Sequence, residues 1–382
     1  MARPKRQIGY LGIGIALLLA VVGLSACGSS SSSSSSTTET SESSEGSGGS
    51  TTASETSSGE KYNITLDING TFNSWRTQMQ HTVEFAAENE PLGPKVNFKF
   101  VASPESLSGQ ANDLNNIIAE KPDAILLDAA SATGLNAQVT KACAAGIIVV
   151  SFDNVVTSPC AYKITTNIKE EGELVATHIA EQLNEEGEVI VDRAFPGAAI
   201  ADELYSGYTN VIKKFPKMKI AASIESKWVP GTLKSQVGSV LAAHPNVAAV
   251  LFDIYIEPVL AAFEEAGLPP AKIGTGTITN GDVAACEKAK AECTSSTNPP
   301  LLGAEALKLA VELLEGKAAE SENEVFIKTP FLFTNPVPSV PGFEGAKIEQ
   351  AEHDPSISKE AVFPIAPEWL DITPEQATGA SA

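Results

Sequence analysis

Apolar residues between positions 62 and 276 occur in short runs that alternate with longer stretches of helical spacing. Two of the runs, 124–127 and 147–150, are apolar at every position, which is typical of strands buried on both faces of a parallel sheet. Strand, helix and strand at this spacing predict βαβ units in an α/β fold. The predicted strands are Tyr62–Ile68, Val96–Val101, Ala124–Asp128, Ile147–Phe152, Val189–Asp192, Met218–Ile224, Val247–Phe252 and Lys272–Gly276. The predicted helices begin near Ser74, Ser106, Thr133, Lys169, Ala198, Thr232, Glu257 and Gly281.

The strand-and-helix pattern is long enough for two sheets. Residues 60–382 remain once the N-terminal segments are set aside, and this length predicts two doubly wound parallel-sheet lobes. Ligands of such sheets bind outside the carboxyl ends of the strands, and polar and aromatic residues gather there in this chain. The candidate ligand-binding residues are Asn69, Asn73, Trp75, Arg76, Asp128, Asp153, Asn154, Trp228, Asp253 and Tyr255.

These residue types suit a small polar solute such as a sugar. Indole rings can cover the apolar faces of a sugar ring, carboxylates accept hydroxyl protons, and Asn and Arg supply donors. Each residue also has a structural alternative. Trp75 could be a core residue, and Asp128 and Asp153 could cap the helices that follow them. Asn73 could be both the N-cap of the helix at Ser74 and a ligand contact.

The N-terminus carries a pattern typical of exported proteins. Three basic residues precede the apolar run 8–24, and small residues lie before Cys27, which predicts a signal peptide over residues 1–26. The stretch Leu-Ser-Ala-Cys resembles the lipobox of bacterial lipoproteins, in which the Cys becomes the acylated N-terminus. An uncleaved transmembrane anchor is the alternative. Both interpretations place the folded part outside the membrane.

Residues 27–60 are rich in Ser, Thr, Gly and Glu, without aromatic or large aliphatic residues before the end of the segment. Such a composition cannot bury enough surface to order itself, and it predicts a flexible tether. Without residues 1–26, 47 acidic against 23 basic side chains give a formal charge of −24. This charge argues against nucleic acid or an anionic lipid surface as a partner.

Four cysteines remain when Cys27 is lipidated, and an even number in an exported protein suggests disulfides. Three pairings are possible. We favour the local ones, Cys143–Cys160 and Cys286–Cys293, because each closes a short loop, and a loop of ~15 residues contributes roughly 3 kcal/mol. Zinc is the rival interpretation. No Cys-x-x-Cys occurs and the four His are far apart in sequence, so we expect no metal and no cofactor.

Four motifs, taken together and in order, carry a family resemblance. They are Asn-Ser-Trp-Arg at 73–76, Lys-Pro-Asp-Ala-Ile-Leu-Leu-Asp at 121–128, the run 145–154 that ends in Phe-Asp-Asn, and Ala-His-Pro-Asn-Val-Ala-Ala-Val at 243–250. Over about residues 62–335 the chain resembles the ribose-binding type of periplasmic solute receptor, the type I binding proteins of ABC importers. The resemblance implies two lobes joined by three chain crossings, a Venus-flytrap arrangement.

The resemblance also implies the lobe boundaries. The first lobe would comprise residues 62–166 plus 299–334, and the second lobe 167–298 plus 335–350. Residues 351–382 would form a C-terminal extension. The crossings would lie around 165–167, 298–300 and 334–336.

The family's ligand contacts match Asn73, Trp75, Arg76, Asp128, Asp153 and Trp228. Three positions depart from the pattern of the ribose receptor. Asn154 stands where the ribose receptor has Arg, Asp202 or a neighbour replaces the second-lobe Arg, and Gly276-Thr277 replaces an Asp. These departures argue against ribose itself and leave the ligand open.

We therefore expect a monomeric, lipid-anchored receptor outside the cell membrane, on the periplasmic side in a Gram-negative cell. It would capture a small polar, sugar-like solute by hinge closure and deliver it to the permease of an ABC importer. The same fold could instead present its ligand to a signalling partner. An exported carbohydrate-active enzyme is disfavoured, since no Gly-x-Ser-x-Gly, His-Glu-x-x-His or Walker loop occurs. A sugar-responsive repressor is disfavoured because no DNA-binding segment precedes the domain.

Overall fold

A computed structural model describes residues 61–317, 323–334 and 346–379. The predicted signal peptide 1–26, its Cys27 and the tether 27–60 lie outside the described residues. Residues Ser58–Ala382 form one compact unit. Two sheets organise its described part, and each sheet with its helices forms one lobe of an α/β fold, as predicted.

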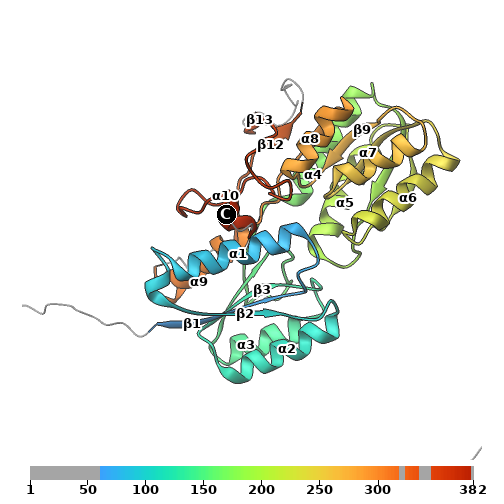
Figure 1. The fold of residues 1–382 in the computed structure, drawn as a ribbon. Helices are drawn as coiled ribbons and strands as arrows, with labels where there is room; N and C mark the ends of the chain where they lie inside the picture. The colour runs from blue at the N-terminus through green and yellow to red at the C-terminus, as the bar shows by residue number, and fades with distance from the viewer. Residues whose placement is uncertain (1–60, 318–322, 335–345, 380–382) are drawn as a thin grey trace, which may run out of the picture. The chain divides into compact units, whose positions relative to one another are not determined.

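The first lobe is an all-parallel sheet with helices on both faces. Its elements are β1 Tyr62–Ile68, β2 Val96–Ala102, β3 Ala124–Asp128, β4 Ile148–Phe152, β5 Tyr162–Thr165, β11 Glu324–Phe326, α1 Ser74–Glu88, α2 Leu107–Glu120, α3 Asn136–Ala144 and α9 Leu302–Leu314. The strand order is β11-β5-β4-β3-β1-β2. Helices α1 and α9 pack on one face and α2 and α3 on the other (Figure 1). All five residues of β3 are buried, which explains why its sequence is apolar almost throughout.

The second lobe has the same layered construction. Its elements are β6 Glu186–Asp192, β7 Lys217–Ile224, β8 Val247–Phe252, β9 Lys272–Thr275, β10 Cys293–Ser295, β12 Phe331–Phe333, β13 Ile348–Gln350, α4 Ile168–Gln182, α5 Ala199–Ile212, α6 Pro230–Ala243, α7 Ile256–Glu265 and α8 Asn280–Ala289. The order is β13-β12-β10-β9-β8-β6-β7, with only the β10–β12 pair antiparallel among these described strands. Separate hydrophobic cores lie under α6–α8 and under α4–α5.

Most of the predicted elements form where the sequence placed them. Strands β1, β3 and β8 have the predicted bounds, and α1 begins at Ser74. The largest difference in a helix start is at α3, which begins at Asn136 and not near Thr133. The sequence did not predict β5 or the elements from β10 onward, the last of which is the helix α10 at Pro374–Thr378.

The third crossing between the lobes lies earlier than expected. Strand β11 belongs to the first sheet and β12 to the second, so the chain crosses at 327–330 and not around 334–336. The expected first-lobe segment 299–334 is therefore too long at its C-terminal end. The cause is a non-local pairing, since β12 joins β10 antiparallel with Leu332 opposite Ser295.

The C-terminal segment from residue 346 contacts both lobes. Strand β13 extends the second sheet, and the Asn280 side chain donates to the Asp354 carbonyl at 2.8 Å. Farther along, Val362 and Gln78 of α1 exchange two hydrogen bonds, of 2.8 and 3.0 Å. Helix α10 packs against α1 (Figure 1). This segment therefore adds a further connection between the lobes.

Both predicted disulfides are confirmed. Cys143 at the end of α3 is bonded to Cys160, and Cys286 of α8 is bonded to Cys293 of β10. Each joins Cα atoms 6.4 Å apart. Within the described ranges, none of the helices combines the length and apolarity needed to cross a membrane, and no cluster of His, Cys, Asp and Glu is arranged to hold a metal.

Candidate functional site

The carboxyl ends of β1, β3 and β4 converge on one cluster of polar side chains in the first lobe. Asn73 is the N-cap of α1, and its Oδ1 accepts from the Arg76 backbone N–H at 2.9 Å. This cap fixes the first turn of the helix, so that Trp75 and Arg76 are held beside the strand ends. Both expectations for Asn73, a cap and a residue at the site, are therefore compatible with its position.

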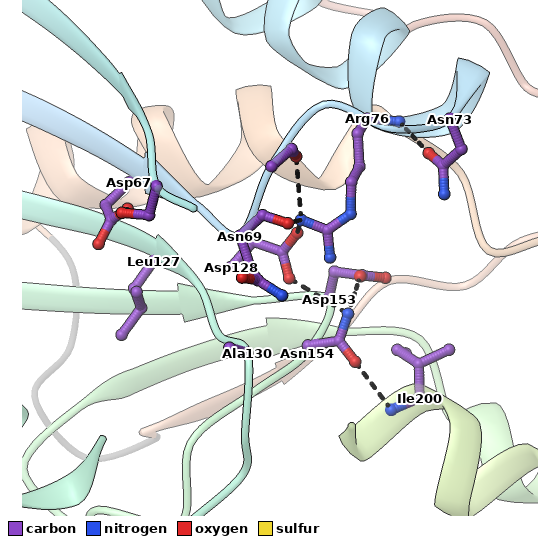
Figure 2. A network of polar contacts seen from close by, with 12 residues as sticks. Asp67, Asn69, Asn73, Arg76, Leu127, Asp128, Ala130, Asp153, Asn154 and Ile200 are labelled. Atoms are coloured by element: carbon purple, nitrogen blue, oxygen red, sulfur yellow. Dashed lines mark hydrogen bonds and ion pairs between the residues drawn. The ribbon is translucent and has the colours of Figure 1, made fainter. Parts of the chain in front are cut away.

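Arg76 and Asp128 form a buried ion pair at the centre of the cluster (Figure 2). The Arg76 Nη1 lies 2.7 Å from Asp128 Oδ2, and the two side chains are 4% and 0% exposed. Arg76 also donates to the Asn69 carbonyl at 3.3 Å. A buried ion pair stabilises the fold little by itself, but removal of one partner leaves the other charge buried and uncompensated. The pair therefore gives the site a fixed geometry.

Asn154 connects this ion pair to its neighbours. Its Nδ2 donates to Asp153 Oδ2 at 2.6 Å and lies 3.2 Å from Asp128 Oδ1. Its Oδ1 accepts from the Ile200 backbone N–H of α5 at 3.3 Å, so the link runs from the first lobe to the second (Figure 2). A second contact across the cleft joins the Ala132 N–H to the Gly197 carbonyl at 3.4 Å. The lobes are thus in direct contact across the cleft.

Asn298, at the second crossing, joins two predicted site residues. Its Nδ2 donates to Asp153 Oδ1 at 2.7 Å, and its carbonyl accepts from Trp75 Nε1 at 2.7 Å. Trp75 is 5% exposed and packs into the core of the first lobe, so its alternative as a core residue is also realised. Sequence reasoning noted Asn298 only as a crossing point. The family resemblance placed the second crossing at 298–300 and assigned Asn298 no contact with the ligand.

The second lobe contributes a carboxylate held by two donors. Asp253, directly after β8, accepts from Trp228 Nε1 at 2.7 Å and from Thr277 Oγ1 at 3.1 Å. Trp228 lies in the loop after β7, and its side chain is therefore oriented by a residue at the end of a different strand, β8. Thr277 stands at one of the positions where the sequence departs from the ribose receptor, and its hydroxyl supports Asp253.

Burial dominates the electrostatics of these carboxylates. It raises the pKa of Asp153 to about 8, with Asp128 nearby as a further cause, and the pKa of Asp253 to about 6. Burial also raises the pKa of Asp128, while the Arg76 guanidinium opposes that shift. Hydrogen-bond donors that approach Asp153 and Asp253 would favour their charged forms.

Several residues around the cleft have a strained backbone conformation. Asp153, Lys227, Trp228 and Tyr255 have φ angles of 54°, 57°, 55° and 80°, the left-handed region that non-glycine residues seldom occupy. Each follows a strand end that faces the cleft. Such residues cost about 1–3 kcal/mol each and cluster at functional sites, where the surrounding fold holds them.

Two adjoining cavities occupy the cleft, and we call them the inner and outer compartments. The inner compartment has a volume of about 30 Å³ and the outer one about 170 Å³. The inner compartment is lined by Asn73, Trp75, Arg76, Asp153, Asn154, Ile200, Trp228, Asp253, Ile254, Thr277 and Asn298. The outer compartment is lined by Asn69, Phe72, Arg76, Glu105, Ala129, Ala130, Asn154, Phe195, Ala198, Lys227, Trp228 and Val229.

The structure brings eight of the ten candidate residues to the walls of these compartments. Asp128 lies behind the wall, where it holds Arg76 and Asn154. Tyr255 lines neither compartment and packs half-buried between two cores. Asp202, the suggested replacement for the second-lobe Arg, pairs with Arg193 at 2.7 Å and also lines neither.

Comparisons with known proteins agree with this architecture. A family model described as a periplasmic binding protein domain matches residues 65–318. The ribose import binding protein of Bacillus subtilis (strain 168) is 24% identical over 276 residues, which cover 70% of this chain and 87% of that protein. The D-apiose import binding protein of Actinobacillus succinogenes is 25% identical over 140 residues, 36% of this chain and 45% of that protein.

Solved structures show the same fold. An ABC transporter solute binding protein from Thermobispora bispora has a TM-score of 0.65 and 26% identity, and the match covers 72% of this chain and 86% of that one. The binding protein of the arabinose ABC transporter from Shewanella sp. ANA-3, solved with L-arabinofuranose, has a TM-score of 0.65 and 20% identity, covering 71% and 91%. At 20% identity the second likeness concerns the fold alone.

Proposed function

Because this chain belongs to the family of periplasmic binding protein domains, we propose that it captures a sugar or sugar-like solute in the cleft between its two lobes and delivers it to an ABC importer. The observation that carries the proposal is the convergence of side chains from both lobes on one cleft. Asp153 and Arg76 come from the first lobe, and Trp228 and Asp253 come from the second. The curated relatives, import binding proteins for ribose and D-apiose, support the same ligand class.

The chemistry of the cleft suits a polyhydroxylated solute. The carboxylates of Asp153 and Asp253 can accept hydroxyl protons, the Arg76 guanidinium has donors to offer, and the Trp228 ring can cover an apolar sugar face. A hydrogen bond to a charged group contributes about 1.5–3 kcal/mol, and an unpaired buried partner costs a similar amount. Several such contacts would reject a solute with one misplaced hydroxyl.

Hinge closure follows from the division of the site. Neither lobe alone supplies the whole set of contacts, so a bound solute favours the closed state by its difference in affinity for the two states. The chain segments that cross between the lobes at 166–167, 296–301 and 327–330 would act as the hinge. The closed receptor would then be the form that a permease recognises.

We further propose that the receptor is a monomeric binding protein and not an enzyme. Asp153 and Asp253 are each held by two internal donors, which suits recognition. Export by the signal peptide 1–26, acylation of Cys27 and the tether 27–60 would place the folded part outside the cell membrane, on its outer face. This placement rests on the sequence pattern at the N-terminus.

Thermal-shift screening tests the proposal. Residues 58–382, the compact unit, would be screened against pentoses, hexoses, polyols and nucleosides. A ligand at 100 times its Kd stabilises by about 2.7 kcal/mol, which corresponds to roughly 4 °C for a unit of this size. We expect such a shift for a sugar or sugar derivative, and we expect Asp153→Ala to abolish it.

Asp371→Ala, a change at an exposed carboxylate distant in sequence from the cleft residues, is the matched control and should keep the shift. If Asp153→Ala retains the full shift, the cleft is not the binding site. If no member of the panel shifts the melting temperature, sugar capture is wrong.

A further inference from the structure

The two compartments of the cleft differ in the residues that line them. The inner compartment is lined mostly by polar side chains, whereas apolar side chains from both lobes wall most of the outer one, with Phe72 on the first lobe and Phe195 and Val229 on the second. Arg76, Asn154 and Trp228 line both. The two compartments are therefore neighbours that share these three side chains.

The two compartments also differ in volume. The inner volume of about 30 Å³ accommodates no more than about two water-sized probes, and the outer volume is about 170 Å³. The hydroxyl-rich part of a ligand matches the polar inner walls, and the lobes must separate slightly to admit it. The outer space is left for a further group of the same ligand, one that tolerates apolar surroundings.

Aromatic surfaces face the outer compartment from both lobes. The rings of Phe195 and Trp228 are stacked, with centroids 6.0 Å apart and planes 9° from parallel. On the first lobe the Arg76 guanidinium lies over the Phe72 ring, 5.0 Å from its centroid. Phe195 is 37% exposed, so its ring is accessible from the outer compartment that it lines. Walls of this kind suit a flat ring.

One residue that lines the outer compartment carries a buried acceptor without a partner among the described residues. Asn69 is 8% exposed, and its Oδ1 accepts no hydrogen bond from the described residues. An unsatisfied buried acceptor is unfavourable, and a ligand N–H that reached it would satisfy it. At the rim of the same compartment lie Lys227 and Glu105, which can interact with polar edges of a bound group.

We propose that the outer compartment is a second subsite, which receives a flat ring attached to the captured sugar and carrying an N–H donor for Asn69. A nucleoside has this chemistry. An aryl glycoside has the flat ring without the N–H. This inference rests on the proposed function, because it presumes that a sugar occupies the inner compartment.

Isothermal titration calorimetry of residues 58–382 tests the subsite. The probes are D-ribose with adenosine and uridine, and D-glucose with phenyl β-D-glucoside. We expect at least one glycoside to bind about tenfold or more tighter than its free sugar, since stacking of a base on an aromatic side chain is worth roughly five- to a hundredfold. Phe195→Ala should remove that difference and change the affinity for the free sugar less than twofold.

Two further variants make the test specific. Leu107→Ala is the matched control, because Leu107 is 42% exposed and lines neither compartment, and it should leave all affinities unchanged. Asn69→Leu should weaken nucleosides several-fold and spare the phenyl glucoside, whereas Asn69→Asp, which keeps an acceptor, should retain most nucleoside affinity.

Each outcome decides between the two proposals. If the free sugars bind as tightly as their glycosides, the second subsite is wrong while sugar capture stands. If Phe195→Ala weakens free sugars and glycosides equally, the outer compartment holds the sugar itself and the assignment is overturned. If none of the probes binds, the second subsite is rejected, and sugar capture is decided separately by the thermal-shift panel.

Discussion

Removal of Arg76 should reveal how strongly the buried ion pair determines the stability of the site. Arg76→Met keeps much of the side-chain volume and removes the guanidinium 2.7 Å from Asp128. Asp128 is then a fully buried carboxylate with only Asn154 as a side-chain donor. Breaking a buried pair in this way costs about 3–5 kcal/mol in the free energy of unfolding.

The cost should depend on pH in a defined direction. Burial raises the folded-state pKa of Asp128, and loss of Arg76 removes the charge that opposes the shift. The folded variant therefore binds a proton more readily than the unfolded chain, so its stability falls as the pH rises from about 4. We expect the difference between wild type and Arg76→Met to be larger at pH 8 than at pH 4.5.

Urea unfolding of residues 58–382 measures both effects. Asp128→Asn in the Arg76→Met background should recover much of the loss, because it removes the uncompensated charge. Lys99→Met is the matched control, since its partner Glu120 lies 2.6 Å away but both side chains are about half exposed. An exposed pair contributes about 0–1 kcal/mol. If Arg76→Met costs no more than Lys99→Met at pH 8, the reasoning is refuted.

Two further predictions concern Asp153 and the C-terminal segment. Burial raises the pKa of Asp153 to about 8, so Asp153 should contribute a loss of stability of up to about 1.4 kcal/mol per pH unit between pH 5 and pH 8, and Asp153→Asn should reduce the slope of stability against pH by that amount in urea unfolding. An equal slope in both proteins would contradict this. Gln78→Leu should cost about 2 kcal/mol and accelerate hydrogen exchange at Val362, because it removes both bonds to that backbone. Gln80→Leu, two residues farther along the same helix and with a side-chain bond to Glu84, should do neither.

Local sequence patterns predicted those elements whose burial can be inferred from a few neighbouring residues. Strands β1, β3 and β8 have their predicted bounds because runs of apolar residues define strands buried on both faces. The carboxyl ends of those strands then located most of the candidate residues. Tyr255, which follows β8 by three residues, lies on the helical side of the turn and packs into the cores instead of lining either compartment.

What the sequence did not predict depends on contacts between distant residues. Trp75 donates to Asn298, which lies 223 positions later, and no local pattern specifies that pair. Strand β12 has three residues and exists because β10 lies beside it, so the third crossing was misplaced. The C-terminal segment is rich in Pro and acidic residues, and its backbone is ordered by side chains such as Gln78 and Asn280.

Sugar-dependent closure of the lobes is the central claim, and an inter-lobe distance tests it most directly. Spin labels at Ser108→Cys on α2 and Ser235→Cys on α6, both exposed positions in different lobes, would report that distance by double electron–electron resonance. With the panel member that gives the largest thermal shift, we predict a shorter and narrower distance distribution, and no change in Asp153→Ala. An identical distribution with and without that saturating compound would contradict a receptor that closes on its solute.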